Sequence, residues 1–143
     1  MARRPQTRRG VDVTYLWIAI GGALGSMARY GVSSLIAARF GDVFPWGTLI
    51  VNISGCFVIG FFAGLTGPDG RVMVAPDLRT FVTVGLCGGY TTFSSFSLQS
   101  LNLLREGDLL RGGGNIVLSV LTCMIAVWIG AAAAAALNRL KGA

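Results

Sequence analysis

The sequence predicts an all-α integral membrane protein with four transmembrane helices, the third of which contains a break. Hydrophobic residues make up 53% of the 143 positions and charged residues only 13%, which is far from the composition of a soluble domain. A helix that crosses a hydrocarbon core of about 30 Å needs roughly 20 mainly apolar residues, and windows of this kind can be marked along the chain. The bilayer is therefore expected to be the solvent of this protein.

The chain divides into a basic N-terminal tail, residues 1–12, and a single four-helix transmembrane domain, residues 13–143. The tail resembles the charged start of a secretory signal. However, the apolar run that begins at Val13 continues to Ala38 without a small-residue cleavage pattern, so it is expected to be a retained helix. The bias of Lys and Arg favours a cytoplasmic N-terminus, and most of this bias comes from the tail.

Breaker residues and polar segments separate the other helices. The cluster from Thr66 to Gly70 ends the second helix, and the polar, glycine-rich segment from Arg105 to Gly114 is expected to be a loop. The second, third and fourth helices are accordingly expected over Thr48 to Leu65, Leu78 to Leu104 and Asn115 to Leu137.

The third helix has the most informative sequence. Its apolar run is interrupted by Gly85, Gly88 and Gly89, and a block of threonine, serine and phenylalanine follows. Unwound backbone at membrane depth occurs only where it lines a cavity or a binding site. It exposes carbonyl oxygens, which a hard cation such as Na⁺ prefers, and no acidic side chain is nearby to take their place.

Composition excludes several classes of function. The chain has no histidine, so most catalytic sites lack their usual base or metal ligand, and we expect no enzyme. Cys56, Cys87 and Cys123 lie in apolar segments without metal-ligand or redox spacing and are interpreted as small packing residues. The net charge of +6 comes from basic residues at the ends of apolar segments, where they suit lipid headgroups and not nucleic acid.

Polar side chains inside the spans are few and costly. Thr48 and Asn52 share one face of the second helix, and Asn115 and Ser119 share one face of the fourth. Such residues either join helices by hydrogen bonds or line a functional site, and both readings stay open here. Arg29 is likewise either an interfacial anchor or a functional residue.

Phe93 and Phe96 lie three apart on one face, interleaved with Ser94, Ser95 and Ser97. Ordinary packing is the simple explanation, but a helix against lipid would carry leucine where this segment carries hydroxyls. The edge of a phenyl ring is positive, so rings presented edge-on beside hydroxyl and amide groups can solvate an anion without a fixed positive charge. This lining suits a small, strongly hydrated anion that must also leave again.

Three blocks together resemble the Fluc-type fluoride channels, and the resemblance covers nearly the whole chain. They are Gly21 to Tyr30, Gly47 to Asn52 and Gly88 to Ser97. The resemblance implies a fluoride-selective channel that passively exports cytoplasmic fluoride and so relieves its toxicity. It also implies a multi-pass protein of the cell inner (plasma) membrane.

The same resemblance implies a dimer of two antiparallel subunits, inserted with dual topology, with two fluoride pores and one central Na⁺. The carbonyls of Gly88 and Thr91 would hold the cation. Arg29 would be structural or lie in a vestibule. The residues implied for the fluoride pathway are Asn52, Phe93, Phe96, Thr48, Ser119, Asn115, Ser94 and Ser97.

Two features depart from the family's pattern. Gln99 stands where the family usually has a glutamate, which weakens any role for a charge there. The arginine-rich tail favours one orientation, so a heterodimer with an oppositely oriented paralogue remains an alternative to the homodimer.

The main competing function is a small dual-topology multidrug or cation transporter. It needs a carboxylate inside a span to exchange protons for cationic substrates. All six acidic residues here fall in expected loops or at helix ends, namely Asp12, Asp42, Asp69, Asp77, Glu106 and Asp108.

Overall fold

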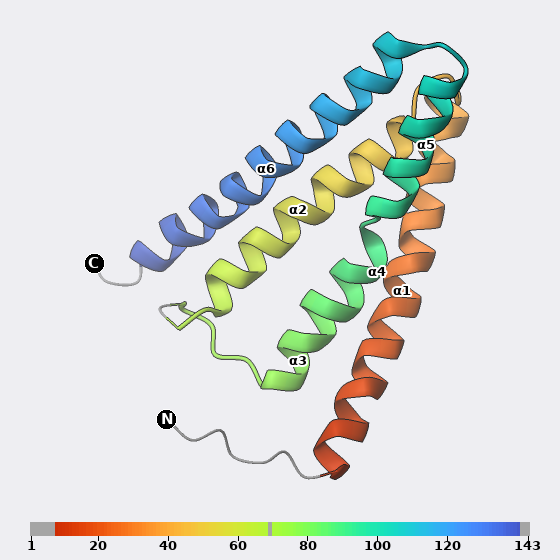
Figure 1. The fold of residues 1–143 in the computed structure, drawn as a ribbon. Helices are drawn as coiled ribbons and strands as arrows, with labels where there is room; N and C mark the ends of the chain where they lie inside the picture. Colours follow the sequence, from red (N-terminus) through yellow and green to blue (C-terminus); the bar gives the residue numbers. More distant parts are fainter. Residues whose placement is uncertain (1–7, 69, 141–143) are drawn as a thin grey trace.

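The computed structural model describes residues 8–68 and 70–140, and in this part of the chain all regular secondary structure is helical, with no strand. Figure 1 shows the arrangement as long rods, one of which is interrupted. The elements are α1 (Arg8–Phe40), α2 (Trp46–Thr66), α3 (Pro76–Thr80), the π-helix η1 (Phe81–Cys87), α4 (Gly88–Tyr90), α5 (Phe93–Arg105) and α6 (Leu109–Arg139).

The described residues thus form four rods, because α3, η1, α4 and α5 follow one another along a single interrupted path (Figure 1). The four-helix prediction is confirmed at this level. Two rods, α2 and α6, are long and apolar enough to cross a membrane. The exposed side chains of α1 and α6 are largely apolar, with Tyr15, Leu35 and Trp128 each more than 60% exposed.

The rods pack in two pairs. α2 lies along α6, and α1 lies along η1 and α4 (Figure 1). Glycines allow both contacts. A Cβ on Gly60 would meet the backbone of Val127 on α6, and one on Gly89 would lie 2.6 Å from the carbonyl oxygen of Gly22 on α1. Because no side chain separates the backbones at these contacts, the paired helices come unusually close.

The predicted helix bounds were too short at several ends. α1 begins at Arg8 and not at Val13, and it ends at Phe40, where the N–H of Gly41 (φ 77°) donates to the Ala37 carbonyl. The tail of residues 1–12 therefore includes the start of α1, while residues 1–7 lie outside the described residues.

The loop predicted from Arg105 to Gly114 is wrong for most of its length. Only residues 106–108 connect α5 to α6, which begins at Leu109. Asp108 caps α6 by accepting from the Arg111 N–H (3.0 Å) and from its guanidinium (2.9 Å). A Cβ on Gly112, which is buried, would lie 2.7 Å from the Leu104 side chain, so this glycine allows α5 and α6 to pack closely here.

Candidate functional site

The interrupted rod stops at Tyr90 and restarts at Phe93. Between them Thr91 (φ −80°, ψ 158°) and Thr92 (φ −152°, ψ 114°) are extended. The side-chain amide of Asn52, on α2, forms hydrogen bonds to the backbone of Thr92 through both its nitrogen and its oxygen. Its Nδ2 donates to the Thr92 carbonyl (3.0 Å), and its Oδ1 accepts from the Thr92 N–H (2.8 Å). One side-chain amide therefore satisfies a backbone that has left the helix.

The interruption diverts two N–H groups from the helical ladder. In a continuous helix the Thr92 N–H would donate to the Gly88 carbonyl and the Ser95 N–H to the Thr91 carbonyl. Instead, Thr92 donates to Asn52, and Ser95 donates to the Thr92 hydroxyl (3.1 Å), which caps α5. The carbonyl oxygens of Gly88 and Thr91 thereby lose their helical donors.

Arg29 holds the other side of the interruption. It is half-buried, and its Nε donates to the Gly89 carbonyl (3.2 Å), to which the Ser26 hydroxyl also donates at 3.4 Å. These contacts place the positively charged guanidinium of Arg29 at the carboxyl end of α4, where it interacts favourably with the free carbonyls of the helix end.

Below Asn52, a groove of about 290 Å³ opens between α2, the interruption and α6. Ser119 reaches this groove because α2 and α6 run parallel in a fixed register. Gly60 contacts Val127 and Gly64 contacts Ala131. Eight residues earlier on both helices, about two turns, the same register places Asn52 opposite Ser119. The lining carries no charged residue; it comprises Asn52, Cys56, Thr91, Thr92, Phe93, Phe96, Ser119, Val120, Cys123 and Met124.

Phe93 and Phe96 both line the groove, and their ring centroids lie 5.1 Å apart with planes at 58°. Tilted rings of this kind present an edge and a face to the space beside them. Their environments differ sharply, because Phe96 is 6% exposed and Phe93 is 76% exposed. Phe93 is therefore a large apolar side chain that this single chain leaves uncovered.

A chain of buried polar groups leads away from the groove. The Ser119 hydroxyl donates to Asn115 Oδ1 (3.3 Å), and Asn115 Nδ2 donates to the Ser100 hydroxyl (2.8 Å), which donates to the Phe96 carbonyl (2.8 Å). All three side chains are at most 5% exposed. Polar groups buried this deeply are retained only when they are satisfied, as they are here.

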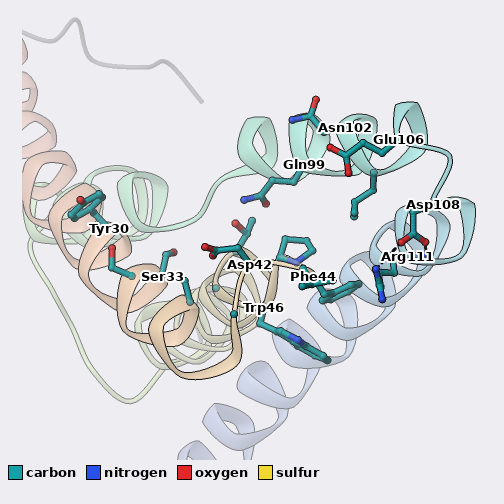
Figure 2. Close-up of a pocket in the computed structure, with 18 residues that line it drawn as sticks. Tyr30, Ser33, Asp42, Phe44, Trp46, Gln99, Asn102, Glu106, Asp108 and Arg111 are labelled. Atoms are coloured by element: carbon teal, nitrogen blue, oxygen red, sulfur yellow. Dashed lines mark hydrogen bonds and ion pairs between the residues drawn. The ribbon is translucent and has the colours of Figure 1, made fainter.

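A second cavity, of about 530 Å³, lies at the end of the bundle where α1, α2, α5 and α6 meet their connections. Figure 2 shows Gln99, Asp42 and Glu106 around it, with Asp108 and Arg111 paired at its edge. Thr48, 8% exposed, also lines it. The Oε1 atom of Gln99 is buried and has no hydrogen-bond partner among the described residues.

Comparison with known proteins identifies the family. A family model described as "CrcB-like protein, Camphor Resistance (CrcB)" matches residues 16–131, which is most of the chain. The chain belongs to the CrcB-like family.

Three curated relatives align along almost their whole lengths, and each is named "Fluoride-specific ion channel FluC". The protein of Methylocella silvestris is 57% identical over 90% of this chain and 98% of its own length. That of Opitutus terrae is 59% identical over 90% and 97%, and that of Rhodospirillum rubrum is 60% identical over 88% and 98%. The resemblance noted in the sequence is thus confirmed at the level of the family.

In this CrcB-like chain the predicted site residues fall into three groups. Asn52, Phe93, Phe96 and Ser119 meet in the groove, with Asn115 directly behind Ser119. Thr48 and Gln99 line the second cavity. Ser94 and Ser97 are exposed and line neither cavity; the Ser97 hydroxyl donates to the Phe93 carbonyl (2.9 Å), and that of Ser94 contacts Thr92 Oγ1 (3.2 Å).

Sequence reasoning missed two participants in this CrcB-like site. Ser100 follows Phe96 by four residues and therefore lies on the same helix face, a signal that could have been read. Thr92 was treated as part of an unwound stretch, but its pairing with Asn52 had no sequence signal, because 40 residues separate the two.

Proposed function

We propose that this chain is a fluoride-specific ion channel that lets cytoplasmic fluoride leave the cell passively. The observation that carries the proposal is the groove, in which an amide, a hydroxyl and two phenyl rings converge without any charged residue. The curated relatives that align along nearly the whole chain are named as fluoride-specific channels, which supports it.

The groove residues can solvate an anion with neutral donors. Asn52 uses one N–H of its amide on Thr92, and an NH₂ group has a second one to offer. Ser119 makes a long bond to Asn115 (3.3 Å), and rotation of its hydroxyl turns the proton toward the groove. The edges of Phe93 and Phe96 supply further positive partial charge. Weak, distributed solvation permits fast exit, whereas a buried cation would hold the ion.

Passive conduction is sufficient for detoxification. Fluoride enters a cell as its neutral acid and dissociates there, and the negative interior then drives the anion outward through any selective pathway. The protein needs no catalytic group and no energy source, so it is no enzyme. A proton-coupled cation transporter would need a carboxylate deep within a span. Among the described residues, Asp42, Glu106 and Asp108 lie in connections, Asp77 lies in the first turn of α3, and Asp12 lies near the start of α1.

We further propose that two chains associate antiparallel in the inner (plasma) membrane, as a multi-pass dimer. Phe93, 76% exposed, and the exposed apolar faces of α1 and α6 leave surface for a partner or for lipid. A homodimer is the simpler assembly, and pairing with an oppositely oriented paralogue is the alternative that the basic tail favours. An axis beside the interruption would bring two copies of it together.

A Na⁺ ion at that axis fits the donors present. The carbonyls of Gly88 and Thr91 are those whose helical donors are diverted, and Gly88 is exposed. The described residues contain no group of three or more His, Cys, Asp or Glu that could hold a metal, so backbone oxygens are the suitable ligands. When bound, the ion would supply a fixed positive charge that holds these carbonyls in place.

Ion efflux from liposomes tests the function. Vesicles containing the purified chain and loaded with potassium fluoride should release fluoride once a potassium ionophore is added, and chloride-loaded vesicles should release nothing above protein-free controls. Electrodes selective for each anion measure both. Equal release of the two anions, or release of neither by folded protein, would contradict the proposal.

A further inference from the structure

Two cysteines lie side by side in the groove, one helical turn beyond Asn52 and Ser119. The register of α2 and α6 determines this position. Gly60 meets Val127, and four residues earlier on both helices the same register brings Cys56 to Cys123. Their side chains are close enough to interact with each other. Both residues line the groove and are half-buried, so the pair is in contact with the cavity and not sealed in the core.

The surroundings of this pair suit a soft cation. Met124, whose thioether is also soft, lines the same groove, while no carboxylate does. No group of three or more His, Cys, Asp or Glu gathers within the described residues, so a four-coordinate zinc-type site is not formed. Two thiols that face each other provide the linear, two-coordinate arrangement that Hg(II), Ag(I) and Cu(I) accept.

We propose that Cys56 and Cys123 form a binding site for a soft, two-coordinate cation of the Hg(II) type, which bridges α2 and α6 inside the groove. With mercuric chloride, two Hg–Cl bonds break and two Hg–S bonds form. The two thiol protons and two chloride ions leave, and the metal keeps its oxidation state. The neutral chloride complex can reach the groove through lipid or through water.

A bridging metal would fill the groove next to Asn52 and Ser119. If the groove is the anion path, as the proposed function requires, the bound metal blocks fluoride efflux. The third cysteine provides a matched control. Cys87 lies on η1, is 4% exposed and does not line the groove.

The test measures mercury retention by the full chain in detergent, separately from transport. The protein is reduced, freed of reductant, loaded with one equivalent of mercuric chloride and then challenged with excess 2-mercaptoethanol. Wild type and Cys87→Ser should retain about one mercury per chain, and Cys56→Ser and Cys123→Ser should lose it roughly tenfold faster, because the second thiol acts at high effective concentration. Methylmercury chloride, which forms a single Hg–S bond, should leave all four proteins equally fast.

Two results would overturn the site: unchanged retention after loss of Cys56 or Cys123, or lost retention in Cys87→Ser. Fluoride efflux is then measured with the same four proteins in liposomes. Efflux with mercuric chloride is compared with the same protein's efflux without it. The metal should stop efflux in wild type and Cys87→Ser, and should leave the ratio near one in the other two. If mercury is retained but fluoride efflux continues, the metal site is supported and the groove is not the anion path. The two proposals can therefore fail separately.

Discussion

The α2–α6 pair and the α1–α4 pair both pack through close backbone contacts, but only the first pair consists of two continuous helices. Both bring backbones together at glycines, at Gly60 and Val127 in the first pair and at Gly89 and Gly22 in the second. In the first pair both helices are continuous, so side chains meet layer by layer and the register positions Asn52, Ser119 and the two thiols. In the second, the helix is interrupted two residues later, and backbone groups of the interruption lose their helical hydrogen-bond partners. The continuous helices thus position side chains, whereas the interrupted helix exposes backbone groups.

The largest effect is expected where the two regions meet, at Asn52. Asn52→Asp should abolish fluoride efflux, because a carboxylate repels the anion and cannot donate to the Thr92 carbonyl. Leaving that carbonyl without its donor should also cost about 1 to 3 kcal/mol of stability. Efflux per folded protein and thermal denaturation in detergent measure the two effects separately.

Asn138 offers the matched control for this substitution. Its side chain also bridges two backbone groups, donating to the Gly64 carbonyl (3.1 Å) and accepting from the Arg71 N–H (3.1 Å), but at the far end of α6. Asn138→Asp should lower stability while efflux per folded protein stays near wild type. If Asn52→Asp conducts normally, Asn52 is not part of the pathway.

The next effect concerns the continuous pair. Gly60→Ala places a methyl group against the backbone of Val127 and should cost about 1 to 3 kcal/mol, because backbone cannot move aside as a side chain would. The control is Gly114→Ala, on α6, where a Cβ would have open space around it. This change should leave the free energy of unfolding unchanged or raise it by up to about 1 kcal/mol. Thermal denaturation of both variants compares them, and equal shifts would show that α2 and α6 are not held at this contact.

The two phenylalanines give a smaller effect that separates packing from conduction. Phe93→Ile and Phe96→Ile keep bulk but remove the positive ring edge, which should reduce efflux several-fold, a change on the order of 1 kcal/mol in the barrier. Stability should fall only for Phe96, since Phe93 is 76% exposed in the chain. Methionine should be tolerated better than isoleucine at both positions, because its side chain is polarizable. Efflux that follows stability alone would make both residues packing residues.

The smallest effect is expected for Ser26→Ala, at the carbonyl of Gly89. Ser26→Ala removes a long hydrogen bond (3.4 Å) and should cost about 0.5 kcal/mol, while Arg29→Met removes a charged donor (3.2 Å) and should cost about 1.5 to 3 kcal/mol less any compensation from Ser26. Denaturation of the single and double variants measures the coupling. A double variant whose loss equals the sum of the singles would show that the two donors act independently.

The sequence predicted what depends on periodicity. The shared face of Asn115 and Ser119 follows from the spacing of a helix, and the structure places Ser119 in the groove and Asn115 directly behind it. Local capping was harder to predict, because the glycines at 112–114 suggested a loop, whereas Asp108 caps α6 before them and Gly112 packs closely against Leu104. The bond between Asn52 and Thr92 depends on how two rods dock, and no local pattern encodes that distance.

The pairing of Asn52 with Thr92 also has a consequence for how the protein is made. During synthesis α2 leaves the ribosome before the interrupted rod, since Asn52 precedes Thr92 by 40 residues. The amide that satisfies the exposed peptide group is therefore already available when that group enters lipid. An interruption that entered first would hold an unpaired N–H and carbonyl in hydrocarbon, at a cost of several kcal/mol for each group. The order of the helices along the chain thus allows the interruption to enter the membrane after Asn52, the residue that satisfies its backbone groups.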